Sequence, residues 1–480
     1  HPAVRPHAQR RMGNRCPQPL QLALGLMLRP RPRDHPDFYH QLSDIRLDPA
    51  FQHPMGNRSI ADRIHLRHRC MHWIFVRPQS TETSYRMLIP TNAQLMSRRR
   101  LIGLALGTTS FADLLMPRLE AQSNQRDADG FLLPAKGFVP RLPLDHGAHP
   151  GFKLEWWYVT GHLTDETGGF HGFQITFFRR ASRIARSTQE PVLADDSELH
   201  LAHTALLDAK DRSFHHDERI NRRGWDADAA TDKLDVRNGN WSLRAIEPDV
   251  PDSPIALDGR IRGTHHLQLT LTPSKRLVVF GEEGVSKKGS SDSASSHYLT
   301  YPRLKAEGHL VRTNRPPLKL HGAAWMDHEI SSSQLDSGQV GWDWLGIQLD
   351  DGREIMVYVL RRTDGSPDPA SKITWIDRDG NTSSSDTSKF QLLPKGEWKS
   401  RATGTTYPAS MLLVCRDPAS ERPLSLEITP RFDAQEMTSR LGKSLSYWEG
   451  ACEVREGRNK IGNAYMELTG YGKAMTDVLR

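Results

Sequence analysis

Residues 157–165 read WYVTGHLTD, and a related run, WLGIQLD, occupies residues 344–350. Each run continues into a strand-like segment that ends in two arginines, at residues 177–180 and 359–362. Two further pairs match in the same order: TALLD at 204–208 with TWID at 374–377, and LQLTLTP at 267–273 with LSLEITP at 424–430. The separation between matched segments shrinks along the chain, as expected if the first copy has longer loops. Three ordered matches predict two copies of one β domain.

The chain around these matches alternates apolar with polar residues. Phe173, Ile175 and Phe177 fall on one face of a strand, with polar residues between them. Turns that contain Asp and Gly separate such runs, and no long amphipathic helix interrupts them. We therefore expect an all-β protein with few short helices, in which each of two tandem copies forms an antiparallel β-barrel or a strongly bent sandwich. The domains are expected at 135–312 and 316–476, and they meet at a Thr-Asn-Arg-Pro-Pro sequence.

The N-terminal part of the chain differs in composition from the rest. Residues 1–121 contain 18 Arg, no Lys and 8 Asp or Glu, which gives this part a net charge of +10. Because the whole chain carries +7, the remaining residues carry −3. Residues 1–95 show no sustained period, which predicts a non-domain extension that is either disordered or upstream of the true start. Residues 96–121 have the charged, apolar and small-residue order of a signal peptide. Their SRRR sequence resembles a twin-arginine signal, with a general secretory signal as the alternative, so we expect an exported, periplasmic protein.

Charge, motifs and cysteines exclude several classes of function. Because the positive charge lies in the N-terminal part, it indicates no nucleic-acid-binding surface on the body. A P-loop, a nucleophile elbow and a Gly-rich dinucleotide turn are absent from the sequence, so no cofactor is expected. The apolar run of the signal is too short for an integral membrane span. Cys415 and Cys452 lie in strand-like runs, where one disulfide and two buried thiols are both consistent with the sequence.

Histidines occur in close pairs, which raises the question of a metal site. The pairs are His200 with His203, His215 with His216, and His265 with His266. On a strand, adjacent residues and residues three apart point to opposite faces, so none of these pairs forms a chelate by itself. We therefore expect no metal site.

An acidic and aromatic stretch, GAAWMDHE at residues 322–329, is the strongest candidate for chemistry. A carboxyl group in apolar surroundings either pairs with a cation or becomes neutral through a raised pKa. Asp327 is therefore the first candidate for a catalytic acid. The alternative is a capped turn between two strands, in which His328 and Glu329 are solvated.

A second aromatic group, EWWY at residues 155–158, also lies beside an acid. Alternate residues of a strand share a face, so one pair of these side chains fills a core while the other faces a cavity or a domain interface. The candidate ligand-binding residues are Glu155, Trp156, Trp157, Tyr158, Trp342 and Trp344, the last two being the corresponding pair in the second copy. Aromatic walls suit a flat, elongated apolar ligand, and core packing accounts for them as well.

Five motifs together resemble a known family. They are EWWY at 155–158, SHYLTYPRL at 296–304, WMDHE at 325–329, YWEG at 447–450 and YMELTGY at 465–471. The set resembles the AttH-like, lipocalin-like family that includes the carotenoid 1,2-hydratases, also called hydroxyneurosporene synthases. The resemblance covers residues 135–475 and implies two lipocalin-like β domains packed together, in agreement with the internal repeat.

The resemblance also implies a mechanism. Hydration of an isolated alkene needs an acid that protonates carbon, surroundings that tolerate a carbocation, and a positioned water molecule. The matching positions are Asp327 for the acid, Tyr298, Trp325 and Tyr301 for the aromatic surroundings, and His297 or His328 for orienting the water or the acid. Tyr301 is also counted among the ligand-binding residues.

Three departures from the hydratase pattern weaken carotenoid hydration specifically. Trp325 stands where the hydratases tend to have tyrosine, and their upstream His-x-Trp is present only as His297-Tyr298-Leu299. Glu329 follows the Asp-His pair where the hydratases usually continue with Asn. These changes leave an apolar-ligand cavity with an acid intact.

Three functions therefore remain for comparison. The first is binding of a lipophilic, isoprenoid or lipid-like small molecule, with hydration or isomerisation by acid chemistry at Asp327. The second is a non-catalytic carrier of the same kind of ligand, associated with an envelope transport partner. The third is a sugar-binding or glycan-processing β protein, suggested by the tryptophans and acids.

Overall fold

The computed structural model of the protein describes residues 125–182, 198–440, 442 and 445–475. The predicted extension at 1–95 and the predicted signal peptide at 96–121 lie outside these residues. Both therefore stay predictions.

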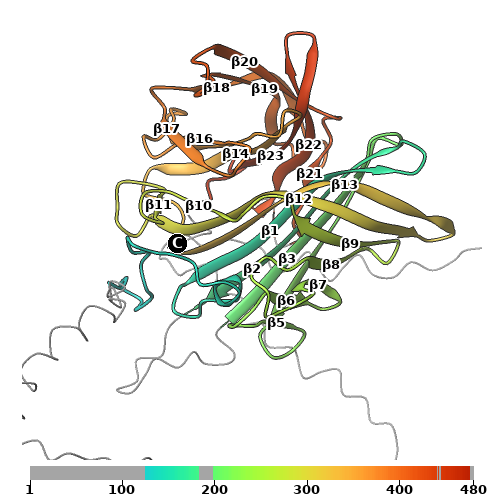
Figure 1. Ribbon diagram of the computed structural model, residues 1–480, viewed down its shortest axis with the longest axis horizontal. Coiled ribbons are helices and arrows are strands. Elements are labelled where there is room, and N and C mark those ends of the chain that lie inside the picture. The colour runs from blue at the N-terminus through green and yellow to red at the C-terminus, as the bar shows by residue number, and fades with distance from the viewer. Residues whose placement is uncertain (1–124, 183–197, 441, 443–444, 476–480) are drawn as a thin grey trace, which may run out of the picture. The chain divides into compact units, whose positions relative to one another are not determined.

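The first sheet contains thirteen strands, coloured from cyan to gold in Figure 1. Neighbouring strands are antiparallel, in the order β4-β3-β2-β1-β13-β12-β9-β8-β7-β6-β5, and β10 and β11 pair with β12. The bounds are β1 (Leu154–Asp165), β2 (Phe170–Ala181), β3 (Glu198–Asp208), β4 (Ser213–Arg222), β5 (Ala227–Ala229), β6 (Asp235–Asn238), β7 (Trp241–Ala245), β8 (Ile255–Ile261), β9 (His265–Pro273), β10 (Val278–Phe280), β11 (Ser286–Lys287), β12 (Ser295–Arg312) and β13 (Arg315–Ser333).

The second sheet contains ten strands, coloured from gold to red in Figure 1. Its order is β17-β16-β15-β14-β23-β22-β20-β19-β18, and β21 pairs with β22. The bounds are β14 (Gln339–Leu349), β15 (Glu354–Arg362), β16 (Lys372–Ile376), β17 (Thr382–Asp386), β18 (Gln391–Lys399), β19 (Thr406–Arg416), β20 (Pro423–Pro430), β21 (Glu436–Met437), β22 (Tyr447–Glu456) and β23 (Asn459–Thr469).

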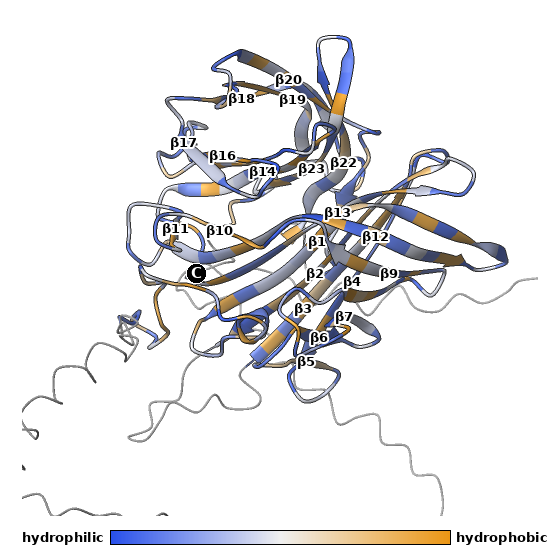
Figure 2. Ribbon diagram, viewed as in Figure 1, coloured by the Kyte–Doolittle hydropathy of each residue, from blue (hydrophilic) through white to orange (hydrophobic). Residues whose placement is uncertain are grey.

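Each sheet curls around an apolar core of its own, the first as a nearly closed barrel and the second as a half-barrel. The alternation seen in the sequence determines which residues enter the core. Phe173, Ile175 and Phe177 of β2 are all buried in the first core. The alternating colours along β9, β12 and β13 in Figure 2 show the same two-residue period. The prediction of an all-β protein with few short helices is confirmed, and the helical element in the described part of the chain is a 3-10 turn at Leu144–His146.

The internal repeat appears in the topology of the two sheets. In the first sheet β1, β2 and β3 lie side by side and β13 closes onto β1; in the second, β14, β15 and β16 lie side by side and β23 closes onto β14. The matched segments at 204–208 and 374–377 belong to β3 and β16, and those at 267–273 and 424–430 belong to β9 and β20. Each pair therefore occupies the same place in its sheet.

The alignment of residues 157–165 with residues 344–350 must be shifted by one residue to agree with the structure. Trp157 lies in the core of the first sheet, whereas Trp344 points away from the core of the second sheet. Tyr158 shares the orientation of Trp344, because alternate residues of a strand point to opposite faces. Tyr158 and Trp344 are therefore the equivalent residues.

The predicted junction between the domains is wrong. Thr313 and Asn314 form the turn of a hairpin inside the first sheet, since Arg312 of β12 pairs with Arg315 of β13. Asn314 has a φ of 59°, a left-handed conformation that suits a tight hairpin. The chain passes to the second sheet between β13 and β14, so Asp327 lies on the last strand of the first sheet.

The structure also bears on the two cysteines and on membrane-spanning helices. Cys415 and Cys452 are buried free thiols, so the alternative without a disulfide is the one observed. Among the described residues, no helix has the length and apolar character needed to cross a membrane.

Candidate active site

Four carboxyl groups lie between the facing surfaces of the two sheets. Asp327 and Glu329 belong to β13, Glu449 to β22 and Glu467 to β23. The first three are buried and Glu467 is partly buried. We call these four groups and the aromatic side chains around them the acid layer. Two hydrogen bonds join the sheets across it, from the Tyr158 hydroxyl to Glu449 and from Trp344 Nε1 to the Tyr298 hydroxyl at 3.0 Å.

Asp327 is held by three hydrogen-bond donors. Its Oδ1 accepts hydrogen bonds from Thr300 Oγ1 at 2.6 Å and from Trp325 Nε1 at 2.7 Å, and its Oδ2 accepts one from the Tyr298 hydroxyl at 2.7 Å. The strand register explains this arrangement, because Thr300 lies directly opposite Asp327 on β12 and both Tyr298 and Trp325 are two residues away on the same faces of their strands. The carboxyl is therefore fixed in one orientation.

Burial raises the pKa of Asp327 to about 7, although its three donors favour the ionised form and lower the pKa. The negative charge of nearby Glu329 raises it further. A carboxyl with this pKa is partly protonated near neutral pH. When it is protonated, the hydroxyls of Tyr298 and Thr300 can rotate to accept a hydrogen bond, because a hydroxyl both donates and accepts. The site can therefore hold a proton or release one.

Aromatic rings surround this carboxyl. Trp325 and Trp344 meet edge to face with ring centroids 5.9 Å apart, and Tyr158 meets Trp344 at 5.3 Å. Phe280 of β10 packs against Tyr298 at 5.0 Å. The electron-rich faces of such rings can stabilise a nearby cation.

Lys288, which the sequence does not single out, completes the half of the acid layer that contains Asp327 and Glu329. Lys288 Nζ lies 2.8 Å from Glu329 Oε1 and stands over the rings of Tyr298 and Tyr358, at 4.5 and 4.4 Å from their centroids. Ser296 donates a hydrogen bond to the same carboxylate. Lys288 comes from a Gly/Ser/Lys-rich segment whose composition predicts a loop, so no sequence signal points to it.

The second half of the acid layer contains two facing carboxyl groups. Glu449 and Glu467 are direct partners on neighbouring strands β22 and β23. Burial and the charge of Glu467 raise the pKa of Glu449 well above its usual range, and burial raises that of Glu467 to about 7. Thr469 Oγ1 donates a hydrogen bond to Glu467 at 2.9 Å. Because two such close acids cannot both ionise easily, this pair also holds a proton near neutral pH.

The repeat relates the two halves of the acid layer. AWMD at residues 324–327 and AYME at residues 464–467 occupy the closing strands of the two sheets. Asp327 lies opposite Tyr158, and Glu467 lies opposite Trp344, the residue equivalent to Tyr158. Glu467 is therefore the repeat partner of Asp327. The similarity of these two short segments is the sequence signal that could have identified it.

Several predicted residues lie on the opposite face of the first sheet. His297 and His328 flank Tyr298 and Asp327 in sequence, so strand alternation turns them away from the acid layer. His297 Nδ1 lies 2.7 Å from the carbonyl oxygen of Gly284, and His328 Nε2 lies 2.8 Å from Glu155 Oε1. The prediction that either histidine orients the acid or its water is therefore wrong.

Three candidate ligand-binding residues also lie away from the acid layer, so their prediction is wrong. Trp157 and Tyr301 lie in the first core, and Trp157 stacks on His328 at 4.7 Å. Glu155 is buried on the same side. In contrast, Trp156, Tyr158, Trp342 and Trp344 belong to the apolar cluster of the acid layer, as do Tyr298 and Trp325.

The residues on the opposite face form a second polar cluster. Ligand atoms of His149, Glu155 and His328 lie within 4.8 Å of one another, a spacing that could hold a metal ion. Both Glu155 oxygens are already engaged, by the two histidines and by Arg179 Nε at 3.1 Å. Burial lowers the pKa of His149, but the carboxylates of Glu155 and Asp145 outweigh it and raise the pKa to about 9. A protonated histidine and a guanidinium oppose metal binding, so an ionic hydrogen-bond network explains the cluster better.

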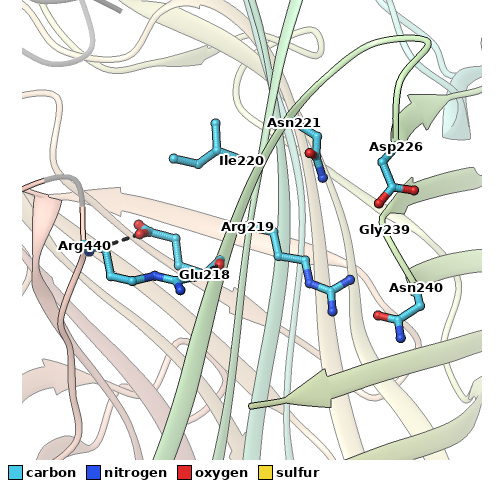
Figure 3. A pocket seen from close by; sticks show the side chains of 8 residues that line it. All are labelled: Glu218, Arg219, Ile220, Asn221, Asp226, Gly239, Asn240 and Arg440. Atoms are coloured by element: carbon cyan, nitrogen blue, oxygen red, sulfur yellow. Dashed lines mark hydrogen bonds between the residues drawn. The ribbon is translucent and has the colours of Figure 1, made fainter. Parts of the chain in front are cut away.

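A surface hollow of about 640 Å³ lies outside the acid layer, beside β4 (Figure 3). Its lining is polar, and the backbone amide of Arg440 donates a hydrogen bond to Glu218 Oε2 at 3.1 Å. Arg219 donates to the carbonyl oxygen of Asn238 and stands over the ring of Trp241. These contacts join β4 to β6, to β7 and to the segment between β21 and β22. None of the predicted site residues lines it.

Comparison with known proteins identifies the family. The sequence pattern described as AttH-like matches residues 134–471. The chain belongs to the AttH-like family. A crystal structure described as an AttH protein from Nitrosomonas europaea is 33% identical, with a TM-score of 0.61 over 70% of this chain and 98% of that one. The resemblance seen in the sequence is thereby confirmed.

A second solved structure shares the fold of this AttH-like protein. Kievitone hydratase from Nectria haematococca is 13% identical, with a TM-score of 0.52 over 73% of this chain and 97% of that one. At this identity the likeness extends to the lipocalin-like fold. None of the curated proteins matches the sequence.

Proposed function

We propose that this AttH-like protein binds a lipophilic small molecule between its two sheets and hydrates or isomerises a double bond by acid chemistry at Asp327. The observation that supports this proposal is a buried carboxyl, held by three donors and enclosed by aromatic rings, whose pKa is raised to about 7. The hydratase among its structural neighbours agrees with this chemistry.

The proposed reaction begins with proton transfer from Asp327 to one alkene carbon. The π bond supplies the electrons of the new C–H bond, and a tertiary carbocation remains on the other carbon. The faces of Trp325 and Trp344 stabilise this cation. Water then forms a C–O bond to the cation and loses a proton to the Asp327 carboxylate. In isomerisation, the carboxylate instead removes a proton from a neighbouring carbon, so the acid is regenerated in both cases.

Replacement of the acid tests the proposal. We expect Asp327→Asn to lower turnover of a responsive alkene by at least about 100-fold, the usual contribution of a positioned general acid. Binding of the same alkene should be preserved, because the amide retains the shape of the side chain. Turnover is followed by mass spectrometry of the products from a panel of isoprenoid alkenes.

Asp343→Asn is the matched control. Asp343 is also a buried aspartate with a raised pKa, but it pairs with Arg361 Nε at 3.1 Å outside the acid layer. Equal loss in both variants contradicts a specific role for Asp327. Absence of turnover by the wild type, together with lipophilic ligands that co-purify with it, favours the non-catalytic carrier.

We further propose that the protein acts after export, in the periplasm, where an envelope transport system could deliver or accept its ligand. The signal-like sequence at residues 96–121 supports this proposal. N-terminal sequencing of the protein from the periplasmic fraction should find a mature start near residue 122. A mature protein that retains residues 96–121 in the cytoplasmic fraction contradicts export.

A further inference from the structure

The buried polar atoms in and beside the acid layer that make no hydrogen bond to any described residue include Glu449 Oε2 and His162 Nδ1. Three more belong to hydroxyl or amide groups. They are Thr160 Oγ1 on β1, Gln174 Oε1 on β2 and the Tyr465 hydroxyl on β23. The three residues are 1%, 0% and 2% exposed. Burial of a polar atom without a partner costs about 1–3 kcal/mol, so three in one region indicate a polar ligand group.

The strand register places these atoms together. Thr160 and Gln174 lie directly opposite each other on neighbouring strands. On β1, Thr160 stands between Tyr158, which donates a hydrogen bond to Glu449, and His162, whose ring lies 6.0 Å from the ring of Tyr465. Because residues 158, 160 and 162 share one face of the strand, Thr160 faces the part of the second sheet that carries Tyr465.

The same register fixes the relation to the catalytic acid. Thr160 is the direct partner of Trp325, which precedes Asp327 by two residues on β13. Two residues of a strand span about 7 Å, so Thr160 lies diagonal to Asp327 across one strand spacing, and Gln174 lies one strand farther away.

We propose that Thr160, Gln174 and Tyr465 form a subsite for a hydroxyl group, so that the ligand is an oxygenated lipophile whose hydroxyl lies away from the reacting double bond. This inference rests on the proposed function and specifies its substrate class. Gln174 Oε1, like every amide oxygen, only accepts hydrogen bonds, and the amide nitrogen donates one to Thr176 Oγ1. A ligand hydroxyl can donate to Gln174 Oε1 while it accepts from Tyr465 or Thr160. A carbonyl oxygen, which cannot donate, leaves Gln174 unpaired.

A matched pair of ligands tests the subsite. Geraniol carries a hydroxyl and a distal trisubstituted double bond, and 2,6-dimethyl-2,6-octadiene is its deoxygenated counterpart. We expect wild-type protein to bind geraniol about tenfold more tightly, as one or two net hydrogen bonds provide. Affinities are measured by quenching of tryptophan fluorescence and checked by titration calorimetry.

Two variants remove single oxygen atoms from the subsite. Thr160→Val and Tyr465→Phe should each reduce the preference for geraniol by about fivefold and change the affinity for the hydrocarbon by less than about twofold. Thr164→Val, at the end of the same strand, is the control and should keep the full preference. Neither subsite variant creates a cavity, and their folding is checked by circular dichroism.

The outcomes separate the subsite from the proposed reaction. Loss of the preference in both variants supports the subsite, even if geraniol is never turned over. Equal affinity of wild-type protein for the two ligands, including failure to bind either, overturns it. The same holds if the preference survives in both variants. Asp327→Asn, which tests the reaction, should leave the preference intact.

Discussion

Asp327 and Glu467 occupy equivalent positions in the two copies of the repeat, but their surroundings differ. Asp327 is held by three donors, including the indole of Trp325, and its neighbour Glu329 has a cationic partner in Lys288. Glu467 instead faces a second acid, Glu449, and the residue equivalent to Trp325 is Tyr465, whose hydroxyl lacks a partner among the described residues. The first copy therefore presents one oriented acid, and the second presents two neighbouring acids with raised pKa values beside unpaired polar atoms. Duplication of one domain has produced two different half-sites.

The largest expected effect concerns the cation of the first half-site. Lys288→Met should lower the free energy of unfolding by about 3 to 5 kcal/mol, because it leaves the Glu329 carboxylate buried without its ion-pair partner. Urea denaturation measures the change. The double variant Lys288→Met with Glu329→Gln removes both charges and should recover most of the loss. If Lys288→Met is as stable as the wild type, the Lys288–Glu329 ion pair does not distinguish the two half-sites.

Replacement of each acid by its amide tests whether Asp327 and Glu467 differ in function. Asp327→Asn should lower turnover by at least about 100-fold, whereas Glu467→Gln should lower it by less than about tenfold. The physical reason is that three donors hold Asp327 in one orientation, whereas Glu467 faces a second acid, Glu449. Steady-state rates of both variants on the same alkene provide the measurement. Equal losses show that both acids take part in proton transfer.

A smaller effect concerns the pH dependence of the reaction. Proton donation by Asp327 requires its protonated form, so the rate should fall as the pH rises through its pKa of about 7. The Tyr298 hydroxyl stabilises the ionised carboxylate, and Tyr298→Phe therefore raises this pKa further. We expect the pH of half-maximal rate to shift upward by about one unit in the pH–rate profile.

Tyr358→Phe is the control for this shift. Its hydroxyl donates to the carbonyl oxygen of Lys287 at 3.1 Å and makes no hydrogen bond to Asp327. The profile of this variant should match that of the wild type. A downward shift in Tyr298→Phe contradicts the assignment of Asp327 as the proton donor.

The sequence predicted the fold class and the central acid for identifiable reasons. Residues such as Phe173, Ile175 and Phe177 recur at the two-residue period of strands, and that period depends on local backbone geometry alone. The repeat was visible because equivalent strands keep similar side chains. Asp327 was identified because an acid among aromatic residues is unusual. Its proton-donating role stays a prediction.

The errors arose where contacts between distant segments decide the outcome. The domain junction was placed in a hairpin turn, because Pro and Asn at residues 313–317 are equally typical of linkers and of turns. The family resemblance implies that His297 or His328 orients the acid or its water, but adjacent strand residues point to opposite faces, so both histidines lie away from the acid layer. Lys288 reaches the acid layer from a Gly/Ser/Lys-rich segment, and Glu449 reaches it from β22, where the YWEG motif is visible in the sequence but not its contact with Tyr158.

The amino-acid sequence alone determined the two-residue alternation, the repeated β domain, the AttH-like resemblance and the presence of Asp327 in an aromatic strand. These properties are local or compositional, so they can be recognised from the sequence without a structure. Only the tertiary structure decided which face of each strand meets the other sheet. That choice places Asp327 against Tyr298 and Trp325, pairs Tyr158 with Glu449, and turns His328 into the first core. The reason is physical: the packing of two curled sheets selects one face of every strand, and a sequence specifies alternation without specifying what lies opposite.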